Sequence, residues 1–530
     1  MTMATSSRAA ESSSTAGPLR RAKIVCTIGP ACESEPMLAD LMRLGMDVAR
    51  LNFSHGTQDQ HARVIERLRR VAGQQGRSIC ILQDLQGPKM RTGRLRDGQP
   101  VLLEPGRRLT ITTRDVAGTA ELISTTFHEL AREVRPGDRI LLSDGRLSVK
   151  VLDVKGEDVL CEIVEGGPLN EHQGINIPGA LLSVPSLTEK DYADLKFGAG
   201  QSVDAVAVSF VRTADDIHVA KQALVECGAE STMVCAKLEK PQAIVNLEEI
   251  LEVADSVMVA RGDLGVEMAP EKVPIIQKQV IARAFVHRKP VITATQMLES
   301  MIQNPRPTRA EASDVANAII DGSDAVMLSG ETAVGRYPRE AVVMMARLVE
   351  ETEQHLVFSP ASRRRRRSGD QPGGANVLLS LADVQPAQPS TRMEYAPLSI
   401  SEAICESTAH IAEDLRLGAI AIYSESGTTA RLISKYRPRA EVYAFAHVPA
   451  VCNRLNLLWG VRPIPSKPFD SVEVMVKNAE DILREAKVVD CGDIVAIVAG
   501  SQTMRGSTNF IRLHRVGCGA DSTENTSGSR

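Results

Sequence analysis

The chain has 530 residues, more than one hydrophobic core can hold, so we expect about three or four domains. Hydrophobic residues make up 43% and charged residues 24%, a composition that excludes wholesale disorder and a membrane protein. Lys and Arg number 62 against 66 Asp and Glu, and only 3% of residues are aromatic, so the net charge of −4 and the scarcity of stacking rings argue against a nucleic-acid partner.

The N-terminal segment, 1–21, is rich in Ser, Thr and Ala and lacks the apolar core of a secretory signal. We interpret it as a disordered tail, with a transit peptide as the less favoured alternative. The ten cysteines include no CxxC pair, and a chain of this size needs no disulfide bonds, so we predict reduced thiols and a cytoplasmic location. No apolar run approaches the ~18 residues that would predict a membrane span.

Eight short apolar runs, each followed by polar residues and a helical stretch, are the main pattern of the chain. Such runs predict buried parallel strands joined by crossover helices, and eight of them close naturally into a (β/α)₈ TIM barrel. The runs begin at Lys23, Val48, Ile79, Ala205, Met233, Val257, Pro290 and Ala325.

The segment 97–186, between the third and fourth runs, differs in character because Gly and Pro turns separate strand-like runs of alternating polarity. It predicts a small β-barrel domain inserted after strand 3. Without this insert, 22–96 and 187–357 together approach the roughly 250 residues typical of a TIM barrel.

The composition changes after the barrel. Residues 358–397 are rich in Ser, Pro and Gly and include the five arginines Arg363 to Arg367, so we predict a low-complexity linker, with a nucleic-acid or localisation patch as the less favoured alternative. Residues 398–517 predict a separate C-terminal α/β domain, and 518–530 a tail. The buried-strand candidates of this C-terminal domain begin at Ala419, Glu441 and Asp493.

Polar side chains follow the barrel strands, at the end where the working residues of such barrels lie. Glu239 and Asp263 follow adjacent strands, and Lys237 stands two residues before the first of them. Two carboxylates completed by water and substrate suit Mg²⁺ or Mn²⁺ rather than zinc. Lys237, with Arg50 at another strand end, suits a phosphoryl group in transfer. A purely structural polar rim is the alternative.

The turn 262–265 contains two glycines and could open a short helix whose free N–H groups accept a carboxylate or a phosphate. No Walker-type GxxxxGK[ST], nucleophile-elbow GxSxG, zinc-binding HExxH or strand-following GxGxxG occurs. His55 follows the second strand, where a capping or packing role is as open as a functional one.

Taken together, the strand-end segments resemble the pyruvate kinase family. They are KIVCTIGPA, GMDVARLNFSHG, DLQGPKMRTG, AVSFVR, AKLEK, VMVARGDLGVE, ITATQMLESM, PRPTRAEASDVANAIIDGSDAVMLSGETAVGRYP and SKYRPRA, in the family's order. They cover nearly all of 22–357, with weaker similarity over 398–517. The resemblance implies the final step of glycolysis, Mg²⁺-dependent phosphoryl transfer from phosphoenolpyruvate to ADP, giving pyruvate and ATP, by a homotetramer with a regulatory C-terminal domain.

The resemblance also implies roles for residues at the strand ends. Glu239 and Asp263 match the Mg²⁺ ligands, Lys237 the transition-state stabiliser, and Arg50 the contact to the substrate phosphate. An ammonium that meets the phosphoryl group in flight and the nascent enolate favours the transition state over the ground state, as catalysis requires.

The substrate carboxylate, by the same resemblance, binds the backbone N–H groups of Gly262 and Asp263 alongside Thr295. Thr295, with Ser329 nearby, is placed to help protonate the enolate carbon, and the proton donor itself stays open between these side chains and ordered water. The inserted domain closes over the cleft as a lid. The nucleotide-binding residues would be Pro30, His55 and Arg91.

The family's monovalent-cation pocket corresponds to Asn52, Ser54, Asp84 and the carbonyl of Leu85. Many members have an acidic residue where this chain has Lys89, and the Lys form goes with K⁺ independence, so we predict activity without K⁺. Gln86 and Gln173 stand where many members have Lys, which puts two cationic contacts to substrate or nucleotide phosphates in doubt.

A Ser/Thr/Gly loop in the C-terminal domain is similar to the family's effector-phosphate loop. It comprises Ser424, Ser426, Gly427, Thr428 and Thr429. Glu425 stands where members activated by fructose 1,6-bisphosphate often have Lys, and its charge would repel that ligand. A sugar monophosphate, AMP or no effector is as plausible as fructose 1,6-bisphosphate. The structural alternative to a phosphate-binding loop is a plain N-capped helix.

Two other functions compete with this interpretation. A divalent-metal barrel lyase acting on pyruvate-like enolates needs the same carboxylates but has no use for a β lid or for Arg50 and Lys237. A catalytically inactive metabolite sensor would be expected to lose Lys237 or a metal carboxylate, and all of them are present.

Overall fold

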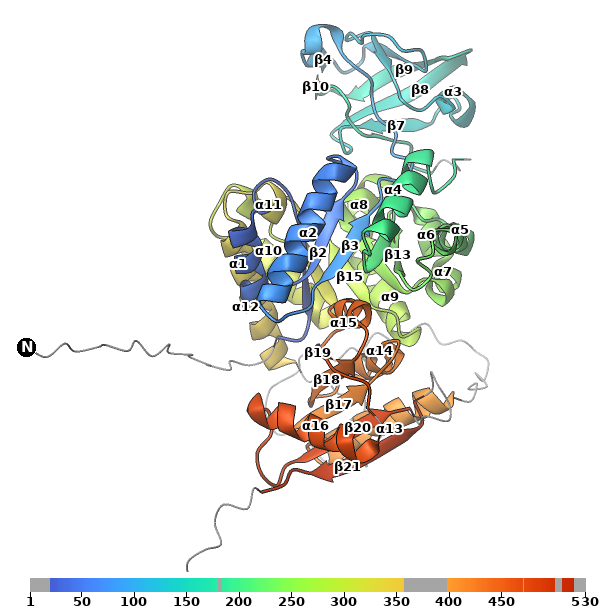
Figure 1. Cartoon of the computed structure of the whole chain (residues 1–530). Coiled ribbons are helices and arrows are strands. Elements are labelled where there is room, and N and C mark those ends of the chain that lie inside the picture. The colour runs from blue at the N-terminus through green and yellow to red at the C-terminus, as the bar shows by residue number, and fades with distance from the viewer. Residues whose placement is uncertain (1–19, 180–183, 357–397, 470, 501–507, 519–530) are drawn as a thin grey trace, which may run out of the picture.

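The computed structural model describes residues 20–179, 184–356, 398–469, 471–500 and 508–518. The predicted tails and the predicted linker with Arg363 to Arg367 lie almost entirely outside these residues, and the predicted domain boundaries stay predictions. The described residues form three units stacked along one axis, with an inserted β domain at the top, a barrel in the middle and an α/β domain at the bottom (Figure 1).

The central unit is a closed barrel of eight parallel strands, hydrogen-bonded in the order β1-β16-β15-β14-β13-β12-β3-β2. All eight predicted strands are present, so the TIM-barrel prediction is confirmed. They are β1 (Lys23–Thr27), β2 (Met46–Asn52), β3 (Cys80–Asp84), β12 (Ala205–Val208), β13 (Met233–Leu238), β14 (Ser256–Ala260), β15 (Val291–Ala294) and β16 (Ala325–Leu328).

Strand side chains alternate between two cores, as the period of a strand requires. Val25, Met258 and Met327 belong to the cluster inside the barrel, whereas Ile24 and Val326 pack against the surrounding helices. This burial on both faces explains why each strand reads as a continuous apolar run.

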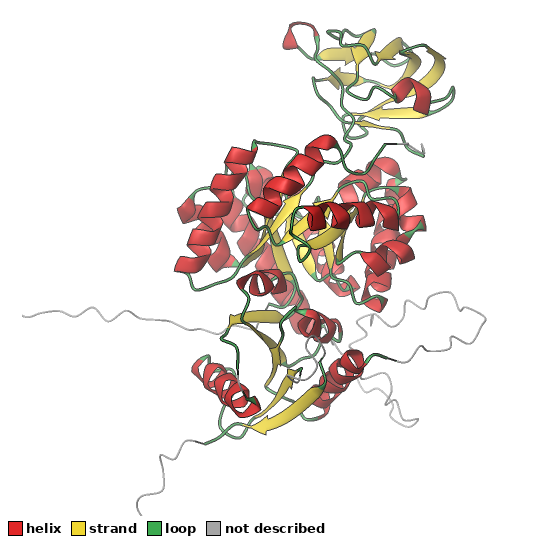
Figure 2. Ribbon diagram, turned by 45° about the vertical axis from the view of Figure 1, so that its right-hand side comes forward, coloured by secondary structure: helices red, strands yellow, loops and turns green. Residues whose placement is uncertain are grey.

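Helices cover the outside of the barrel (Figure 2). They are α1 (Glu35–Leu44), α2 (Gln58–Gln74), α4 (Glu189–Gly200), α5 (Ala214–Glu226), α6 (Pro241–Val245), α7 (Leu247–Val253), α8 (Arg261–Glu267), α9 (Val273–Val286), α10 (Arg309–Asp321), α11 (Gly330–Ala333) and α12 (Pro338–His355), with 3₁₀ turns η2 (Pro270–Lys272) and η3 (Glu299–Ile302). Capping boxes begin α2, α4 and α10, where Thr57, Thr188 and Thr308 accept a hydrogen bond from the first helical turn.

A β-sheet domain follows β3, as predicted. Its strands form a six-stranded sheet, β11-β7-β8-β9-β5-β6, and a separate β10-β4 pair, so the described sheet has two edges rather than one closed ring. The elements are η1 (Arg96–Gly98), β4 (Val101–Leu103), β5 (Arg108–Thr112), β6 (Leu122–Ser124), α3 (Leu130–Glu133), β7 (Arg139–Leu142), β8 (Leu147–Lys155), β9 (Asp158–Glu165), β10 (Gly167–Leu169) and β11 (Ile175–Asn176).

The predicted C-terminal α/β domain is confirmed as a five-stranded sheet in the order β19-β18-β17-β20-β21. Its elements are α13 (Ile400–Asp414), β17 (Ala419–Tyr423), α14 (Thr428–Lys435), β18 (Glu441–Ala446), α15 (Pro449–Leu455), β19 (Val461–Pro465), α16 (Val472–Glu485), β20 (Ile494–Ala499) and β21 (Phe510–Arg515). The sequence predicted the three central strands and missed β19 and β21. These two are edge strands, one with two prolines and one largely polar, so neither has a continuous apolar run.

The C-terminal domain docks on the amino-terminal end of the barrel strands. Asp324 directly precedes β16, and its carboxylate is contacted by Lys435 Nζ and, at 2.9 Å, by Arg437 Nη2. The guanidinium of Arg437 also lies 4.3 Å from the ring centroid of Trp459. The C-terminal domain therefore does not cover the carboxyl end of the barrel strands, which faces the inserted domain.

One prediction about the cysteines is wrong. Cys491 and Cys518, 27 residues apart, form a disulfide that joins the turn before β20 to the residues after β21, while the other eight are free thiols. No local pattern predicts this disulfide, because the two cysteines come together only through the antiparallel pairing of β20 and β21.

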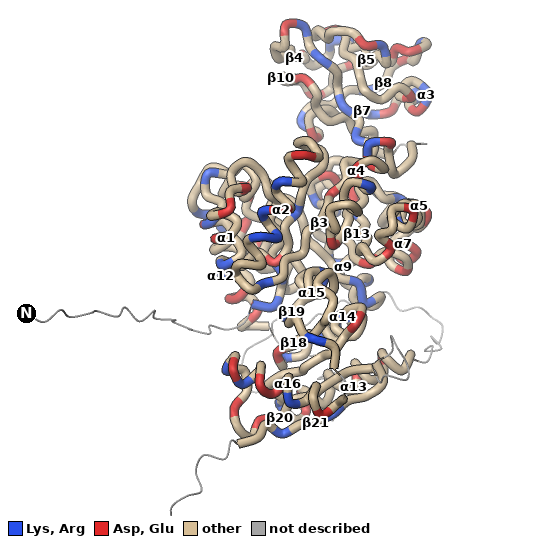
Figure 3. The backbone as a smooth tube through the Cα atoms, in the orientation of Figure 1, with Lys and Arg blue, Asp and Glu red and all other residues tan. Residues whose placement is uncertain are grey.

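No described helix is both long enough and apolar enough to cross a membrane. Cationic and anionic residues are interspersed along the backbone of all three units (Figure 3). Each unit thus contains both signs of charge, in keeping with the small net charge of the whole chain.

Candidate active site

The barrel fold brings seven of the predicted residues to one end of the strands, because parallel strands place their carboxyl ends on the same face. They come from six of the eight barrel strands or from the segments that directly follow them. They are Arg50 on β2, Asp84 at the end of β3, Lys237 and Glu239 at the end of β13, Asp263 in α8 after β14, Thr295 after β15 and Ser329 after β16.

Lys237 is the centre of a buried charge cluster. Its Nζ lies 2.7 Å from Glu239 Oε1 and 3.2 Å from Asp84 Oδ1, and it donates a 2.7 Å hydrogen bond to Ser209 Oγ. Burial disfavours the ammonium, but the negative charges of Asp84, Glu239 and Asp263 outweigh it and raise the pKa of Lys237 above its usual value. The side chain is therefore a fixed cation at neutral pH.

Glu239 is 1% exposed, and its second carboxylate oxygen accepts a 2.8 Å hydrogen bond from the backbone N–H of Phe210. Burial, together with the negative charge of Asp263, raises the pKa of Glu239 despite the opposing charge of Lys237. Asp263 makes no hydrogen bond or ion pair with any residue that the structure describes. Two neighbouring carboxylates, one of them without a partner, leave room for a cation.

Arg50 is held in place by the barrel. Its Nε donates to Asp84 Oδ2 at 2.6 Å and its Nη1 to Thr27 Oγ1 at 2.9 Å. Asp84 is fully buried, which on its own would raise its carboxyl pKa, but Lys237 and Arg50 lower the pKa below its usual value. Nη2 of Arg50 has no partner among the described residues, so it can reach an anion.

Thr295 occupies a strained turn after β15, with a φ of 67°, and Gln296 follows with a φ of 54°. Arg261 supports this turn by donating from Nη2 to the carbonyl of Thr295 at 2.7 Å. The backbone N–H of Gly262 donates to Thr295 Oγ1 at 2.7 Å, so the predicted carboxylate-binding N–H is occupied by this hydroxyl in the structure.

Ser329 lies where β16 ends, and its backbone N–H donates to Glu331 Oε2 at 2.7 Å. Its Oγ is buried with no hydrogen-bond partner among the described residues. A buried hydroxyl of this kind calls for a water or a ligand group.

The predicted nucleotide residues lie on the side of the mouth formed by the first strands. His55 and Pro30 are exposed, and Arg91 Nη1 donates to the carbonyl of His172 in the inserted domain at 3.0 Å. Partial burial and the positive charges of Arg91, Lys89 and Arg50 lower the pKa of His55. The structure thus places His55 within the field of three cations, while Pro30 is exposed at the same end of the barrel.

The predicted monovalent-cation ligands lie together, but protein donors already engage three of them. Asn52 Oδ1 accepts from the backbone N–H of Ser54 at 3.1 Å, and the carbonyl of Leu85 accepts from Ser209 Oγ at 2.7 Å. Asp84 contacts Arg50 and Lys237.

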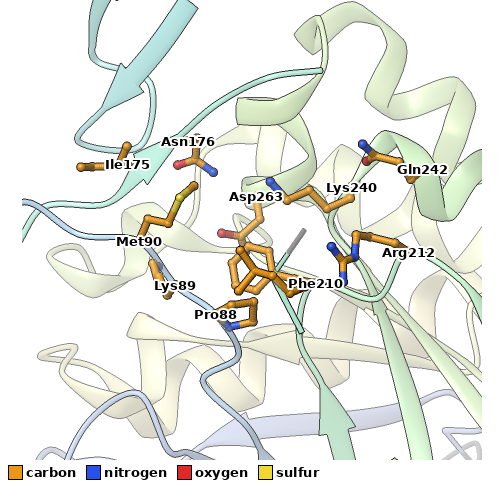
Figure 4. A pocket seen from close by; sticks show the side chains of 11 residues that line it. Pro88, Lys89, Met90, Ile175, Asn176, Phe210, Arg212, Lys240, Gln242 and Asp263 are labelled. Carbon is orange, nitrogen blue, oxygen red and sulfur yellow. Dashed lines mark hydrogen bonds between the residues drawn. The ribbon is translucent and has the colours of Figure 1, made fainter. Parts of the chain in front are cut away.

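The inserted domain touches the mouth through a three-residue link. Asn176 of β11 donates from Nδ2 to Glu267 Oε1 at 2.8 Å, and Lys240 Nζ lies 2.6 Å from the same oxygen. Asn176 from the β domain and Lys240 and Asp263 from the barrel line a pocket between the two units (Figure 4). Lys89 and Met90, from the crossover into the inserted domain, line the same pocket. The pocket therefore changes shape if the β domain moves.

The side chains of the predicted effector loop bond within the loop and to Thr508 in the structure. Gly427, the N-cap residue of α14, has a φ of 88° and makes no side-chain cap hydrogen bond, and its N–H donates to Ser424 Oγ at 2.9 Å. Ser426 Oγ lies 3.0 Å from Thr428 Oγ1, and Thr429 Oγ1 hydrogen-bonds Thr508 Oγ1. These contacts do not test phosphate binding.

Three contributors to the site were missed from the sequence: Ser209, the backbone of Phe210, and Glu267. Ser209 and Phe210 belong to the segment AVSFVR at the end of the fourth predicted strand, which was noted for its resemblance but given no role. The polar Ser directly after an apolar run was the available signal. Glu267, in GDLGVE, gave no signal of its link to the inserted domain.

Within the described residues no three His, Cys, Asp or Glu side chains gather as a metal-binding group. Glu239 and Asp263 offer two carboxylates, and water and substrate oxygens would have to complete the coordination sphere of any ion held there, as they commonly do at Mg²⁺ sites. The donor chemistry fits Mg²⁺ or Mn²⁺.

Comparisons with known proteins agree with this geometry. Residues 19–342 match the family model for the pyruvate kinase barrel domain, and residues 402–514 match that for the pyruvate kinase α/β domain. The chain is 42% identical over 502 residues to a pyruvate kinase of Staphylococcus saprophyticus and 43% identical over 500 residues to one of Geobacillus stearothermophilus, covering 94% of this chain and 81% and 80% of those proteins. A solved pyruvate kinase structure from Cryptosporidium parvum, 34% identical, aligns with a TM-score of 0.84 over 94% of this chain and 96% of that one.

Proposed function

The chain belongs to the pyruvate kinase family, and from that premise we propose how the residues at the barrel mouth perform the family's reaction. The enzyme is a phosphotransferase whose substrates are phosphoenolpyruvate and ADP. The observation that carries the assignment of residues is the cluster of Lys237, Asp84 and Glu239, with Asp263 unpartnered beside it.

Glu239 and Asp263 would hold Mg²⁺, because their charges repel each other and one of them has no protein partner. Bound there, the ion would neutralise phosphoryl oxygens and the developing charge of transfer. The burial of Glu239 and its hydrogen bond from Phe210 fix the direction of one carboxylate before any ligand arrives.

Lys237 and Arg50 are the proposed cationic contacts to the phosphoryl group. Lys237 is fixed by three partners and stays charged, so its ammonium can meet charge that develops on the phosphoryl and enolate oxygens without first reorganising. Arg50 is oriented by Asp84 and Thr27, which leaves Nη2 free for the substrate phosphate.

The second half of the reaction delivers a proton to the enolate carbon. Thr295 and Ser329 are the proposed participants, because one hydroxyl sits in a strained turn beside α8 and the other is buried without a partner. Ser329 would hold an ordered water. For the substrate carboxylate to reach the N–H of Gly262, it must replace Thr295 Oγ1 as acceptor.

The inserted domain would act as a lid over the nucleotide, with His55 and Arg91 on the phosphates and Pro30 against the base or ribose. The link from Asn176 to Glu267 and Lys240 supports this, since it joins the lid to the mouth by few contacts that can break and re-form.

We base the proposal of activity without K⁺ on Lys89, which lines the pocket between the barrel and the inserted domain. Its ammonium would supply the charge of the monovalent ion, and the oxygens of Asn52 and Leu85 already have protein donors. We expect full turnover in buffer free of Na⁺ and K⁺, and we expect Lys89→Glu to make turnover K⁺-dependent. A wild-type enzyme that K⁺ activates from near zero would contradict this.

Three further features rest on the family resemblance and stay predictions. They are a homotetramer, a sugar-monophosphate or AMP effector on the Ser424–Thr429 loop, and a cytoplasmic location. Light scattering of the purified chain tests the first, and calorimetric titration tests the second.

One coupled assay tests the function as a whole. Pyruvate release from phosphoenolpyruvate should require both ADP and Mg²⁺, and EDTA should abolish it. Asp263→Asn should raise the Mg²⁺ concentration needed for half-maximal rate, whereas Asp153→Asn, in β8 of the inserted domain, should not. Pyruvate release that is independent of ADP would favour the lyase alternative instead.

A further inference from the structure

Glu331 is a buried carboxylate at the barrel mouth that has no part in the proposed chemistry. It lies in the short helix α11, directly after β16, and is 2% exposed. Within the described residues it forms no ion pair. Burial raises its pKa, and backbone N–H groups rather than a cation oppose that shift. An unpaired carboxylate is costly to bury, so its hydrogen bonds have to compensate.

Each oxygen of this carboxylate accepts a hydrogen bond from a different strand-end segment. Oε1 accepts from the backbone N–H of Leu298 at 3.0 Å, and Oε2 from that of Ser329 at 2.7 Å. Leu298 follows β15 and Ser329 follows β16, so Glu331 joins the ends of two neighbouring strands. A residue that only capped α11 would need the contact to Ser329 but not the one to Leu298, which spans 33 residues of sequence.

The first of the joined segments carries the hydroxyl of Thr295. Thr295 and Gln296 both have a positive φ, a conformation that persists only where the surroundings hold it. Arg261 holds the start of this turn by donating to the carbonyl of Thr295 at 2.7 Å. Glu331 holds its end through the N–H of Leu298.

The second segment carries the hydroxyl of Ser329. Its Oγ is buried and has no hydrogen-bond partner in the described part of the chain, so the backbone alone sets where the hydroxyl lies. Glu331 holds that backbone by its N–H. The helix α11 is itself anchored, because Thr332 Oγ1 donates to the carbonyl of Thr27 in β1 at 2.8 Å. Glu331 therefore reaches both segments from a fixed base.

We propose that Glu331 is a positioning residue for protonation of the enolate, because it sets the spacing between the Thr295 turn and Ser329. The inference rests on the proposed roles of those two hydroxyls, and Glu331 acts through them and not on the substrate. A carboxylate suits the task, since each of its oxygens can accept one N–H. An amide of the same size has a single acceptor oxygen, and its NH₂ group would face the second N–H donor.

Glu331→Gln tests the proposal with little change in volume. We expect kcat for pyruvate release to fall about ten- to a hundredfold, because a misplacement of about 1 Å at a reacting group can cost that much. The KM for ADP and the Mg²⁺ concentration for half-maximal rate should stay within about twofold. The hydrogen bonds of Glu331 go neither to the proposed metal carboxylates nor to the proposed nucleotide residues.

Glu353 in α12 offers a matched control at the other end of the barrel. It is also buried, and its two oxygens accept from the backbone N–H groups of Arg21 and Ala22, at 2.7 and 2.8 Å, just before β1. Glu353→Gln therefore makes the same chemical change in a similar setting. It should lower the melting temperature about as much as Glu331→Gln but leave kcat within about threefold of the wild type.

Exchange of the methyl protons of pyruvate isolates the protonation step. In reverse, this step breaks a methyl C–H bond, the proton passes to solvent, and the electron pair of the bond forms the enolate. In D₂O with Mg²⁺ and inorganic phosphate, loss of the methyl signal of pyruvate in ¹H NMR measures this rate without phosphoryl transfer. Ser329→Ala and Glu331→Gln should each slow the exchange about tenfold or more.

The double variant tests whether Glu331 acts through Ser329. Residues that act as a unit have effects that do not multiply. Glu331→Gln should therefore slow exchange clearly less in the Ser329→Ala protein than in the wild type. If the two effects multiplied in full, the proposal would be overturned.

Two other results would also overturn it. One is exchange by Glu331→Gln within about threefold of the wild type while Ser329→Ala is slow, and the other is an equal loss of kcat in Glu353→Gln. If Glu331→Gln does not fold, as thermal melting shows, Glu331→Asp takes its place, and if neither folds the carboxylate is structural and the proposal fails. None of these results affects the ADP-dependent release of pyruvate by the wild type, so failure here is distinguishable from failure of the proposed function.

Discussion

Two clusters of buried charge, one at each end of the barrel, use the same kinds of side chain in opposite proportions. At the mouth, Lys237 faces Asp84 and Glu239, with Asp263 close by. At the base, a single carboxylate, Asp324, is shared by Lys435 and Arg437. All of these ion-paired side chains are at least about nine-tenths buried.

The ratio of charges sets the behaviour of each lysine. Both are penalised by burial, but carboxylates outnumber cations around Lys237, and its pKa rises above the usual value. At the base, burial and the charge of Arg437 outweigh Asp324, and the pKa of Lys435 falls to about 8. The same pair of residue types therefore gives a fixed cation in one place and a titratable one in the other.

The difference separates a site from a structural joint. Excess negative charge at the mouth leaves the carboxylate of Asp263 without a protein partner among the described residues, which is the basis for the divalent-ion site proposed above. The base cluster has no unpaired carboxylate, and Trp459 covers one face of its arginine. We therefore expect changes at the base to alter stability and changes at the mouth to alter turnover.

The largest expected effect is at the base. Asp324→Asn removes the shared carboxylate and leaves two buried cations unpaired, which should cost about 3 to 5 kcal/mol in the free energy of unfolding. Trp459, the only tryptophan of the chain, lies in this interface and reports its opening by fluorescence during urea denaturation. Asp153→Asn, at a half-exposed carboxylate paired with Lys155, is the control. If Asp324→Asn lost less than about 1 kcal/mol, as an exposed ion pair would, the structural role of the joint would be contradicted.

At the mouth, Lys237→Met should lower kcat by roughly two to three orders of magnitude, or about 2.7 to 4 kcal/mol, by analogy with the loss of one preorganised donor to a developing oxyanion. Steady-state kinetics at saturating Mg²⁺ measure it. Lys435→Met, the matched change at the base, should leave kcat of the folded enzyme within about threefold. If the two variants lost turnover equally, the contrast between the clusters would fail.

A subtler change at the base is Arg437→Lys, which keeps the charge but loses the flat guanidinium over Trp459 and the forked donation to Asp324 and Gly322. We expect a loss of about 1 to 2 kcal/mol in stability, with turnover unchanged. A loss as large as that of Asp324→Asn would mean that geometry, rather than charge, holds the joint.

The smallest effect is a dependence on pH. The pKa of Lys435 is about 8 in the folded chain against the ordinary 10.5, so between these values the unfolded chain binds more protons and stability rises with pH. The slope from one lysine is at most about 1.4 kcal/mol per pH unit. As pH rises from 8 to 10, the free energy of unfolding of the wild type should increase relative to that of Lys435→Met. If the two free energies of unfolding changed in parallel with pH, the lowered pKa would be contradicted.

The sequence predicted the barrel well because burial of both faces of a parallel strand leaves a local record. Each strand is a short apolar run, and the residue that ends it points to the mouth, so Lys237, Glu239 and Asp263 could be placed in one site by counting runs. The same rule missed β19 and β21, where edge positions relax the need for apolar residues.

Contacts between distant segments left no such record. Ser209, after the fourth barrel strand, accepts a hydrogen bond from Lys237. Asn176 of the inserted domain donates a hydrogen bond to Glu267 of the barrel. Cys491 and Cys518 form a disulfide because β20 and β21 pair. None of these pairs has a spacing that repeats, so no periodicity predicts them.

The sequence by itself thus determined the kinds of charge available and the order of the strands that present them. Which cations share which carboxylates was decided only by the tertiary structure. Asp324 lies more than a hundred residues before Lys435 and Arg437 along the chain and meets them only when the C-terminal domain docks. Because the pKa of a buried group depends on the charges within a few ångströms, the opposite behaviour of Lys237 and Lys435 follows from packing and not from residue type.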